Sequence, residues 1–263
     1  MTVRPTIVKQ TASPSLQRLR LALDDGAHTT AYVASYSLAA TTLQVRRLPA
    51  LTPLAAWCAK RGVAEALVGG FYLRCSGAPP EPTLTGFPLG ELRVNGTEQP
   101  FVPFAHPWGD LRACVSVVRG EVRIARRDDL PARPSGDLLQ AGPLLVRDGR
   151  ALSGDEEGFS AGAEQFDSDI TVGRHPRAAL GCDGERLVAF ACDGRADDDA
   201  GLTLSELAAT MADLGAREAL NLDGGASTSI VCGGGLRNTP REAHGILVPG
   251  GRAVATALVF APR

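Results

Sequence analysis

The sequence has few aromatic residues and no run of lysine or arginine. Phenylalanine, tryptophan and tyrosine together make up 5% of the 263 residues, and the formal net charge is −2. A nucleic-acid groove usually needs a basic stripe, and a groove for single strands also needs aromatic rings on which bases stack. The sequence therefore predicts no nucleic-acid partner.

Long apolar runs are also missing. No stretch approaches the roughly 20 apolar residues that a membrane-spanning helix needs. The N-terminus, residues 1–10, has no apolar middle region of the kind found in secretory signals. We therefore expect no membrane partner and a cytoplasmic location.

None of the six cysteines stands in a C-x-x-C pair, so the sequence supports neither a zinc knuckle nor a dithiol redox motif. Most of them lie among apolar residues, which favours buried free thiols. Cys182 and Cys192 flank a predicted hairpin with Asp183-Gly184 as a two-residue turn. That turn would place Cys182 opposite Glu185 and Cys192 opposite His175, and so keep the two sulfur atoms apart.

A regular alternation of strands and helices is absent, which argues against a doubly wound sheet. Many short strands are expected, but only two firm helices. Thr52 with Pro53 is typical of a helix start, and Thr203 with Glu206 forms a capping-box pattern. We predict an α+β fold with a mixed, mostly antiparallel sheet and a few packed helices. It forms one domain over residues 1–263, with strands and a helix in residues 1–63.

One pattern occurs twice. Residues 62–67 read Gly-x-x-Glu-Ala-Leu and lead to Gly69-Gly70, while residues 215–220 read the same and lead to Gly224-Gly225. Each copy follows an expected helix. The core could therefore be pseudo-symmetric, with two glycine loops facing one cleft. Chance similarity in a chain rich in alanine and glycine is the alternative.

The most informative stretch is Asn221-Leu222-Asp223-Gly224-Gly225-Ala226-Ser227-Thr228-Ser229, which we call the glycine loop. Strand alternation sends Asn221 and Asp223 to one face. The two glycines let a ligand approach the main chain, and the hydroxyls of Ser227 and Thr228 suit phosphate or sugar oxygens. The alternative is a strand–turn–strand unit without a ligand.

Two arginines and a second aspartate could act with the glycine loop. Asp193-Gly194-Arg195 follows a strong strand, and Arg177 begins another. Asp193 could serve as acid, base or metal ligand, while Arg177 and Arg195 offer forks of donors to a phosphate. The alternatives are a structural ion pair at a turn and a solvated arginine.

A divalent cation could be bound by the consecutive carboxylates Asp197, Asp198 and Asp199. A solvated acidic turn is the interpretation we prefer, because neighbouring side chains do not easily converge on one ion.

Eight motifs in a fixed order resemble the phosphodiester glycosidase family, over about residues 64–263. They are Gly69-Gly70-Phe71-Tyr72, Gly142-Pro143-Leu144-Leu145-Val146 with Asp148-Gly149, Pro176-Arg177-Ala178-Ala179-Leu180-Gly181, Asp193-Gly194-Arg195, residues 201–208, the glycine loop, Asn238-Thr239-Pro240, and Arg252-Ala253-Val254. Any one motif is weak, but the ordered set is specific.

The resemblance implies hydrolysis at the anomeric carbon of a small-molecule or glycan substrate that carries a sugar-1-phosphodiester. Arg177 and Arg195 would stabilise the departing phosphate, and Asp223 or Asp193 would activate water or attack the sugar. Further substrate contacts would come from the remaining motif residues, which are Asn221, Ser227, Thr228, Gly224, Gly225, Gly69, Gly70 and Arg252.

Four positions depart from the family pattern. Val68 replaces an asparagine before the first glycine pair, Ala178 a threonine, Ala226 a glycine and Thr256 an asparagine. Two other functions therefore stay open beside the glycosidase. One is a phosphodiesterase that breaks a P–O bond, and the other is a sugar-phosphate binding module that has lost turnover, which Val68 favours.

Overall fold

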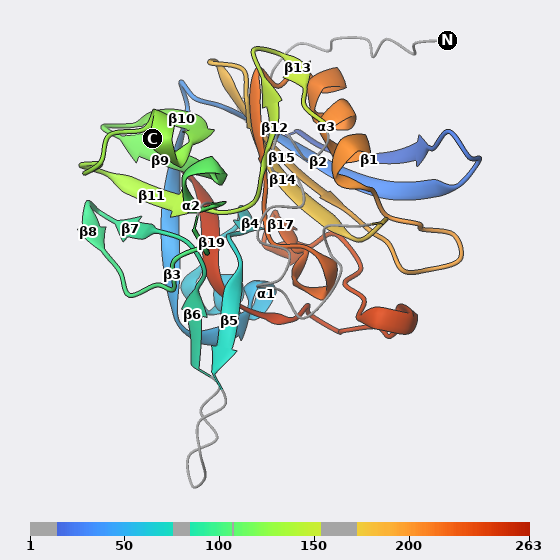
Figure 1. Cartoon of the computed structure of the whole chain (residues 1–263). Helices are drawn as coiled ribbons and strands as arrows, with labels where there is room; N and C mark the ends of the chain where they lie inside the picture. Colours follow the sequence, from blue (N-terminus) through green and yellow to red (C-terminus); the bar gives the residue numbers. More distant parts are fainter. Residues whose placement is uncertain (1–14, 76–84, 107, 154–172) are drawn as a thin grey trace, which may run out of the picture.

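The computed structural model describes residues 15–75, 85–106, 108–153 and 173–263 (Figure 1). Within these residues the strands form three larger sheets and one two-stranded sheet. Every ladder between these strands is antiparallel. The predicted α+β class with mostly antiparallel pairing is confirmed, although the strands are divided among several sheets.

The largest sheet carries most of the candidate residues. Its strands are β1 (Ser15–Ala22), β2 (His28–Ser37), β12 (Leu144–Arg147), β13 (Arg150–Ala151), β14 (Arg177–Cys182), β15 (Arg186–Cys192) and β16 (Glu218–Asn221), in the order β1-β2-β15-β14-β16-β12-β13. The central strands β14 and β15 are almost wholly buried. Their nearly continuous apolar sequences suit strands that are covered on both faces.

Two apolar clusters cover the two faces of this sheet. The first, which we call the inter-sheet cluster, contains Ala178, Ala191 and Leu222 together with residues of the other sheets. The second contains Ala179 and Cys192 together with residues of helix α3 (Leu204–Asp213), and we call it the helix-side cluster. Neighbouring residues of one strand therefore enter different clusters.

Two five-stranded sheets make up most of the rest of the molecule (Figure 1). One contains β3 (Thr41–Pro53), β4 (Ala66–Val68), β17 (Ile230–Cys232), β18 (Gly235–Leu236) and β19 (Ala253–Pro262), in the order β18-β17-β4-β19-β3. The other contains β7 (Leu92–Val94), β8 (Thr97–Glu98), β9 (Ala113–Val118), β10 (Glu121–Arg126) and β11 (Asp137–Gln140), in the order β10-β9-β11-β7-β8. The two-stranded sheet pairs β5 (Tyr72–Cys75) with β6 (Thr85–Pro88).

The two predicted helices are present, but one begins differently. Helix α3 has the predicted capping box, in which the Thr203 hydroxyl accepts from Glu206 N and the Glu206 carboxylate accepts from Thr203 N. Helix α1 (Leu54–Arg61) has no side-chain cap, because Thr52 and Pro53 belong to β3, where they pair with Val254 and Ala253. The prediction that Thr52 caps α1 was therefore wrong. A third short helix, α2 (Trp108–Leu111), precedes β9.

The register of the β14–β15 hairpin also differs from the prediction. Cys182 pairs with Leu187 and Cys192 pairs with Arg177, and three residues, 183–185, separate the two strands instead of two. The Asp183 carboxylate accepts hydrogen bonds from the backbone N–H groups of Glu185 and Arg186 and thereby stabilises the longer turn. Cys182 and Cys192 are free and buried, as expected.

The two glycine pairs of the repeated pattern meet in space. Asp223 N, just after β16, donates to Gly69 O, just after β4, at 3.0 Å. One glycine pair thus ends a strand of the largest sheet and the other ends a strand of the β3–β19 sheet. The predicted pseudo-symmetry and the single domain stay predictions.

The capping box of α3 makes a stability prediction. Thr203→Ala removes the hydroxyl that accepts from Glu206 N, so we expect the free energy of unfolding to fall by about 1 kcal/mol. Thr210→Ala is the matched control, because the Thr210 hydroxyl only donates back to Glu206 O within the same helix. We expect little change there, since alanine has the higher helix propensity. Urea denaturation of both variants measures the difference, and equal losses would contradict the role of the cap.

Candidate active site

The glycine loop connects β16 to β17 and is held by neighbouring segments on several sides. Gly225 N donates to Pro176 O at 2.8 Å, and Arg252 N donates to Ala226 O at 3.1 Å. Asp223 is only 7% exposed, and Gly224 N donates to its Oδ1. The loop therefore brings a buried carboxylate to the place where strands of two sheets end.

Three side chains of the loop have buried polar atoms without a hydrogen-bond partner among the described residues. They are Asn221 Oδ1, Thr228 Oγ1 and Ser229 Oγ. Leaving a buried polar atom without a partner costs about 1–3 kcal/mol. Because native proteins rarely retain such atoms, three on one loop indicate a place where a polar ligand or ordered water completes the hydrogen bonds.

Arg195 lies directly against the second glycine of the loop. A Cβ atom on Gly225 would lie 3.2 Å from one terminal nitrogen of Arg195, and Gly225 has a φ of 60° that favours glycine. Arg195 also donates to Arg241 O at 3.1 Å. Burial lowers the pKa of Arg195, which means that its cation is partly removed from water.

A pocket of about 670 Å³ opens beside Arg195. Its lining also includes Asp197, Asp198, Arg241 and His244. Arg195 therefore reaches both the glycine loop and a solvent-accessible hollow. This arrangement would let an anionic group in the pocket lie close to the loop.

Arg252 provides a second cation near Asp223. Its side chain pairs with Glu242 through both Nε and a terminal nitrogen. Burial acts to lower the pKa of Arg252, but the hydrogen bond and charge of Glu242, with the charges of Tyr72 and Asp223, raise it overall. Arg252 therefore stays charged beside the Asp223 carboxylate.

Asp193 is the second buried carboxyl group, 4% exposed, at the end of β15. Its Oδ1 accepts from Thr239 N at 2.6 Å, and its Oδ2 accepts from the Tyr32 hydroxyl at 3.3 Å. Burial raises the pKa of Asp193 to about 6, although the Thr239 hydrogen bond opposes the change. A carboxyl group with this pKa can gain and lose a proton near neutral pH.

The sheet does not bring Arg177 and Asp193 to the same face. Arg177 pairs with Cys192 of the helix-side cluster, and its Nε donates to Leu202 O in the same cluster. Asp193 follows Cys192 and bonds to Tyr32, which packs against the inter-sheet cluster. Of these predicted site residues, Arg195 alone lines the pocket beside the glycine loop, and the shared hollow expected from the sequence stays a prediction.

Arg177 is nevertheless an unusual cation. It is 2% exposed, and a terminal nitrogen also donates to Gly173 O at 3.2 Å. Among the described residues no carboxylate contributes to its pKa, and burial lowers that pKa to about 10. Its predicted role at the departing phosphate stays a prediction.

The first glycine pair, Gly69-Gly70, packs so closely against β19 that Gly69 leaves no room for a side chain. A Cβ on Gly69 would lie 2.3 Å from Thr256 Oγ1, and Gly70 N donates to the same oxygen at 3.0 Å. Thr256, one of the departures from the family pattern, thus satisfies the backbone of this pair. Val68, another departure, is fully buried in the inter-sheet cluster.

Sequence reasoning missed three residues that position the site. Asn238 bridges the end of the loop, since its Oδ1 accepts from Ile230 N and its Nδ2 donates to Thr228 O. Thr239 and Tyr32 hold the Asp193 carboxylate. The motif Asn238-Thr239-Pro240 was a usable signal for the first two. Tyr32 had none, because it lies 161 residues from Asp193.

The acidic turn after β15 is partly accounted for by protein contacts. Asp199 Oδ1 accepts from Thr30 N and from Arg20. Within the described ranges, no group of three or more His, Cys, Asp or Glu side chains is arranged to hold a metal ion. No helix in the described part of the chain is long and apolar enough to cross a membrane.

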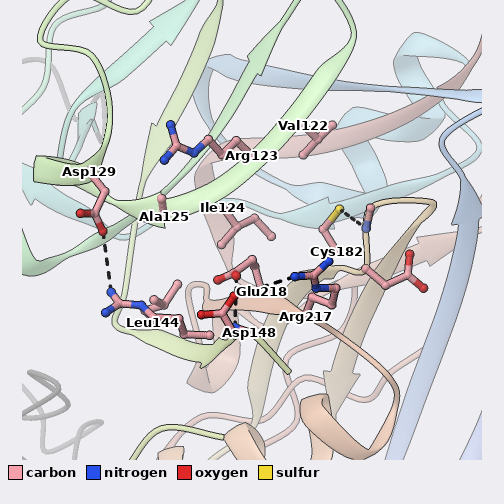
Figure 2. A pocket seen from close by; sticks show the side chains of 13 residues that line it. Val122, Arg123, Ile124, Ala125, Asp129, Leu144, Asp148, Cys182, Arg217 and Glu218 are labelled. Atoms are coloured by element: carbon pink, nitrogen blue, oxygen red, sulfur yellow. Dashed lines mark hydrogen bonds and ion pairs between the residues drawn. The ribbon is translucent and has the colours of Figure 1, made fainter. Parts of the chain in front are cut away.

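A second cleft, of about 440 Å³, lies at the other end of the large sheet. Figure 2 shows Ile124 of β10 on one side of it and Cys182, Arg217 and Glu218 on the other. It contains none of the predicted site residues, because these follow the opposite ends of β15 and β16. Its lining contains both guanidinium groups and carboxylates, and some of them form ion pairs with each other. Arg217 with Asp148 is one such pair.

Comparison with known proteins points in the same direction as the motifs. The model of the phosphodiester glycosidase family matches residues 61–261. The solved catalytic domain of zebrafish N-acetylglucosamine-1-phosphodiester alpha-N-acetylglucosaminidase, auto-inhibited by its pro-peptide, is 19% identical with a TM-score of 0.70. That alignment covers 100% of this chain and 87% of the zebrafish chain. No curated protein sequence matches the chain.

Two bacterial structures share the fold. A hypothetical protein from Synechocystis is 19% identical with a TM-score of 0.61, over 96% of this chain and 63% of its own. A Burkholderia pseudomallei protein described as exported is 16% identical with a TM-score of 0.64, over 90% of this chain and 74% of its own. Identities this low establish the fold alone, and the compartment of this chain stays a prediction.

The raised pKa of Asp193 makes stability depend on pH. Between about pH 4 and pH 6 the folded protein keeps a proton on Asp193 that the unfolded chain has lost. The stability of the wild type relative to Asp193→Asn should therefore fall as the pH rises through this window, by roughly 2 to 3 kcal/mol. Urea denaturation at pH 4, 5, 6 and 7 measures it. A difference that does not change with pH would mean that the pKa of Asp193 is not raised.

The buried hydroxyl of Thr228 makes a second stability prediction. Thr228→Val removes an oxygen that has no partner among the described residues, so we expect the free energy of unfolding to stay unchanged or rise by about 1 kcal/mol. Thr29→Val is the matched control, because Thr29 Oγ1 donates to Asp193 O and accepts from Gly201 N. It should cost about 1–3 kcal/mol. If both variants lose the same stability, the Thr228 hydroxyl is already satisfied and is not reserved for a ligand.

Proposed function

The chain belongs to the phosphodiester glycosidase family, and we propose that it hydrolyses the glycosidic bond of a sugar-1-phosphodiester to release a sugar and a phosphomonoester. The observation that carries the proposal is the glycine loop. It combines a buried carboxylate, three buried polar atoms that lack partners among the described residues, and a guanidinium group packed on Gly225.

The cations near the loop suit a phosphate leaving group. When the bond between the anomeric carbon and oxygen breaks, the electron pair remains on the phosphate oxygen. Arg195, at the pocket beside Gly225, is placed to meet this charge, and Arg252 adds positive potential near Asp223. Fixed donors aimed at developing charge are usually a large contribution to catalysis.

The two carboxyl groups differ in a way that suits two roles. Asp223 lies on the loop itself and would act at the anomeric carbon, as nucleophile or as a stabilising charge. Asp193, with its pKa near 6, would take a proton from the attacking water. The anomeric configuration of the released sugar would distinguish direct displacement by water from a glycosyl-enzyme intermediate on Asp223.

The loop side chains would hold the sugar. Asn221 Oδ1, Thr228 Oγ1 and Ser229 Oγ are buried acceptors, and the two hydroxyls are also donors. Sugar hydroxyl groups can donate to these acceptors and can also accept from the two side-chain hydroxyls. A site built to hydrogen-bond a hydroxyl group rejects an analogue that lacks it, because the site atoms are then left unpaired.

Hydrolysis in ¹⁸O-labelled water, with the wild type and Asp223→Ala, tests the proposal. With a panel of sugar-1-phosphodiesters we expect the label in the sugar, because the bond to carbon breaks. Asp223→Ala should reduce kcat at least 100-fold. The control Asp213→Ala changes an exposed aspartate at the end of α3 and should keep full activity.

Two results would contradict this function. Label in the released phosphomonoester would mean that the P–O bond breaks and that the protein is a phosphodiesterase. Saturable binding of a sugar phosphodiester by the wild type without any product would identify a binding module. A fully active Asp223→Ala variant would remove Asp223 from the chemistry while leaving the reaction type open to the label.

A further inference from the structure

The two oxygens of the Asp193 carboxyl group face different kinds of donor. Oδ1 accepts from the backbone N–H of Thr239 at 2.6 Å. Protonating Oδ1 would weaken this hydrogen bond, because a hydroxyl oxygen accepts less strongly than a carboxylate or carbonyl oxygen. When Asp193 is protonated, its proton is therefore favoured on Oδ2.

Oδ2 faces the hydroxyl group of Tyr32 at 3.3 Å. A phenol group can donate a proton and accept one at the same oxygen, which a backbone N–H cannot do. Asp193 is almost fully buried, whereas Tyr32 is only partly buried. The Tyr32 hydroxyl is thus the side-chain donor that links the buried Asp193 carboxyl to a residue with some solvent exposure.

We propose that Tyr32 relays the proton of Asp193 to solvent. The proposal rests on the proposed function, in which Asp193 takes a proton from water. In the relay, Oδ2–H passes its proton to the Tyr32 oxygen while the phenolic proton of Tyr32 leaves to a solvent water. No electron is transferred, the carboxylate is regenerated, and Tyr32 ends neutral as it began.

The charged groups around this pair are consistent with the relay. Burial and the charge of Asp193 raise the pKa of Tyr32, so the phenol stays protonated at neutral pH. Arg18 of β1 opposes that shift. Asp199 favours a proton on Asp193 and Arg241 disfavours it, while Arg20 pairs with Asp199.

Tyr32 comes from a part of the chain that the family model does not match. It lies on β2, whereas the match begins at residue 61. β2 pairs with β15, and Tyr32 stands opposite Ala191, two residues before Asp193. The N-terminal strands would therefore contribute a positioning residue to the site as well as covering the sheet.

Tyr32→Phe tests the relay, with Tyr36→Phe as the matched control. Tyr36 lies on the same strand, but its hydroxyl donates to Glu65 at 2.8 Å and stands away from Asp193. Both variants lose one hydroxyl group and keep the ring. A pH titration followed by ¹³C NMR of labelled aspartate gives the midpoint of protonation of the Asp193 carboxyl, and Asp193→Asn identifies its signal. Steady-state kinetics gives kcat and KM.

For Tyr32→Phe we expect the Asp193 midpoint to move up by about half a pH unit, because the carboxylate loses a donor. We expect kcat to fall about tenfold with KM nearly unchanged. Added imidazole, a diffusible proton carrier, should restore part of kcat without moving the midpoint. Tyr36→Phe should change neither the midpoint nor the response to imidazole.

The relay is overturned if Tyr32→Phe leaves the midpoint and kcat unchanged, or if kcat falls and imidazole restores none of it. Failure of the proposed function would give a different experimental result. The wild type would then hydrolyse no sugar-1-phosphodiester, although the midpoint of Asp193 would still respond to Tyr32→Phe. The NMR titration needs no turnover and therefore separates the two outcomes.

Discussion

Close backbone contact between two sheets is the constraint on which the site depends. Asp223 N donates to Gly69 O where β16 and β4 end, and Gly69 itself fits against Thr256 only because it has no side chain. This contact leaves the Asp223 carboxylate at the junction of the sheets. Asn238 then holds the far end of the loop through Thr228 O and Ile230 N.

The same loop illustrates how a functional site opposes stability. The residues around it are packed in the ordinary way, with Val68 and Leu222 fully buried in the inter-sheet cluster. Three polar atoms of the loop are buried without partners among the described residues, which folding alone would not favour. A polar ligand explains these atoms better than packing does. The buried carboxyl group of Asp193 is likewise a feature that serves chemistry more readily than stability.

Much of the fold could be predicted from local sequence signals. The capping box of Thr203 and Glu206 and the chain of short strands are both present, because each depends on residues a few positions apart. The prediction for Thr52 failed because pairing with β19 extends β3 through Pro53. The β14–β15 register failed because Asp183 stabilises a longer turn. In the first case a long-range strand pairing prevailed over the local pattern, and in the second case a different local turn prevailed.

The sequence by itself determined the family and the candidate residues, since the ordered motifs around Asp193, Asp223 and Arg252 are all visible in one dimension. Only the tertiary structure decided which of them share a space. A strand sends neighbours to opposite faces, so the pairing of Arg177 with Cys192 separates Arg177 from Asp193. Tyr32 became a partner of Asp193 only because β2 pairs with β15, and no local pattern records a contact across 161 residues.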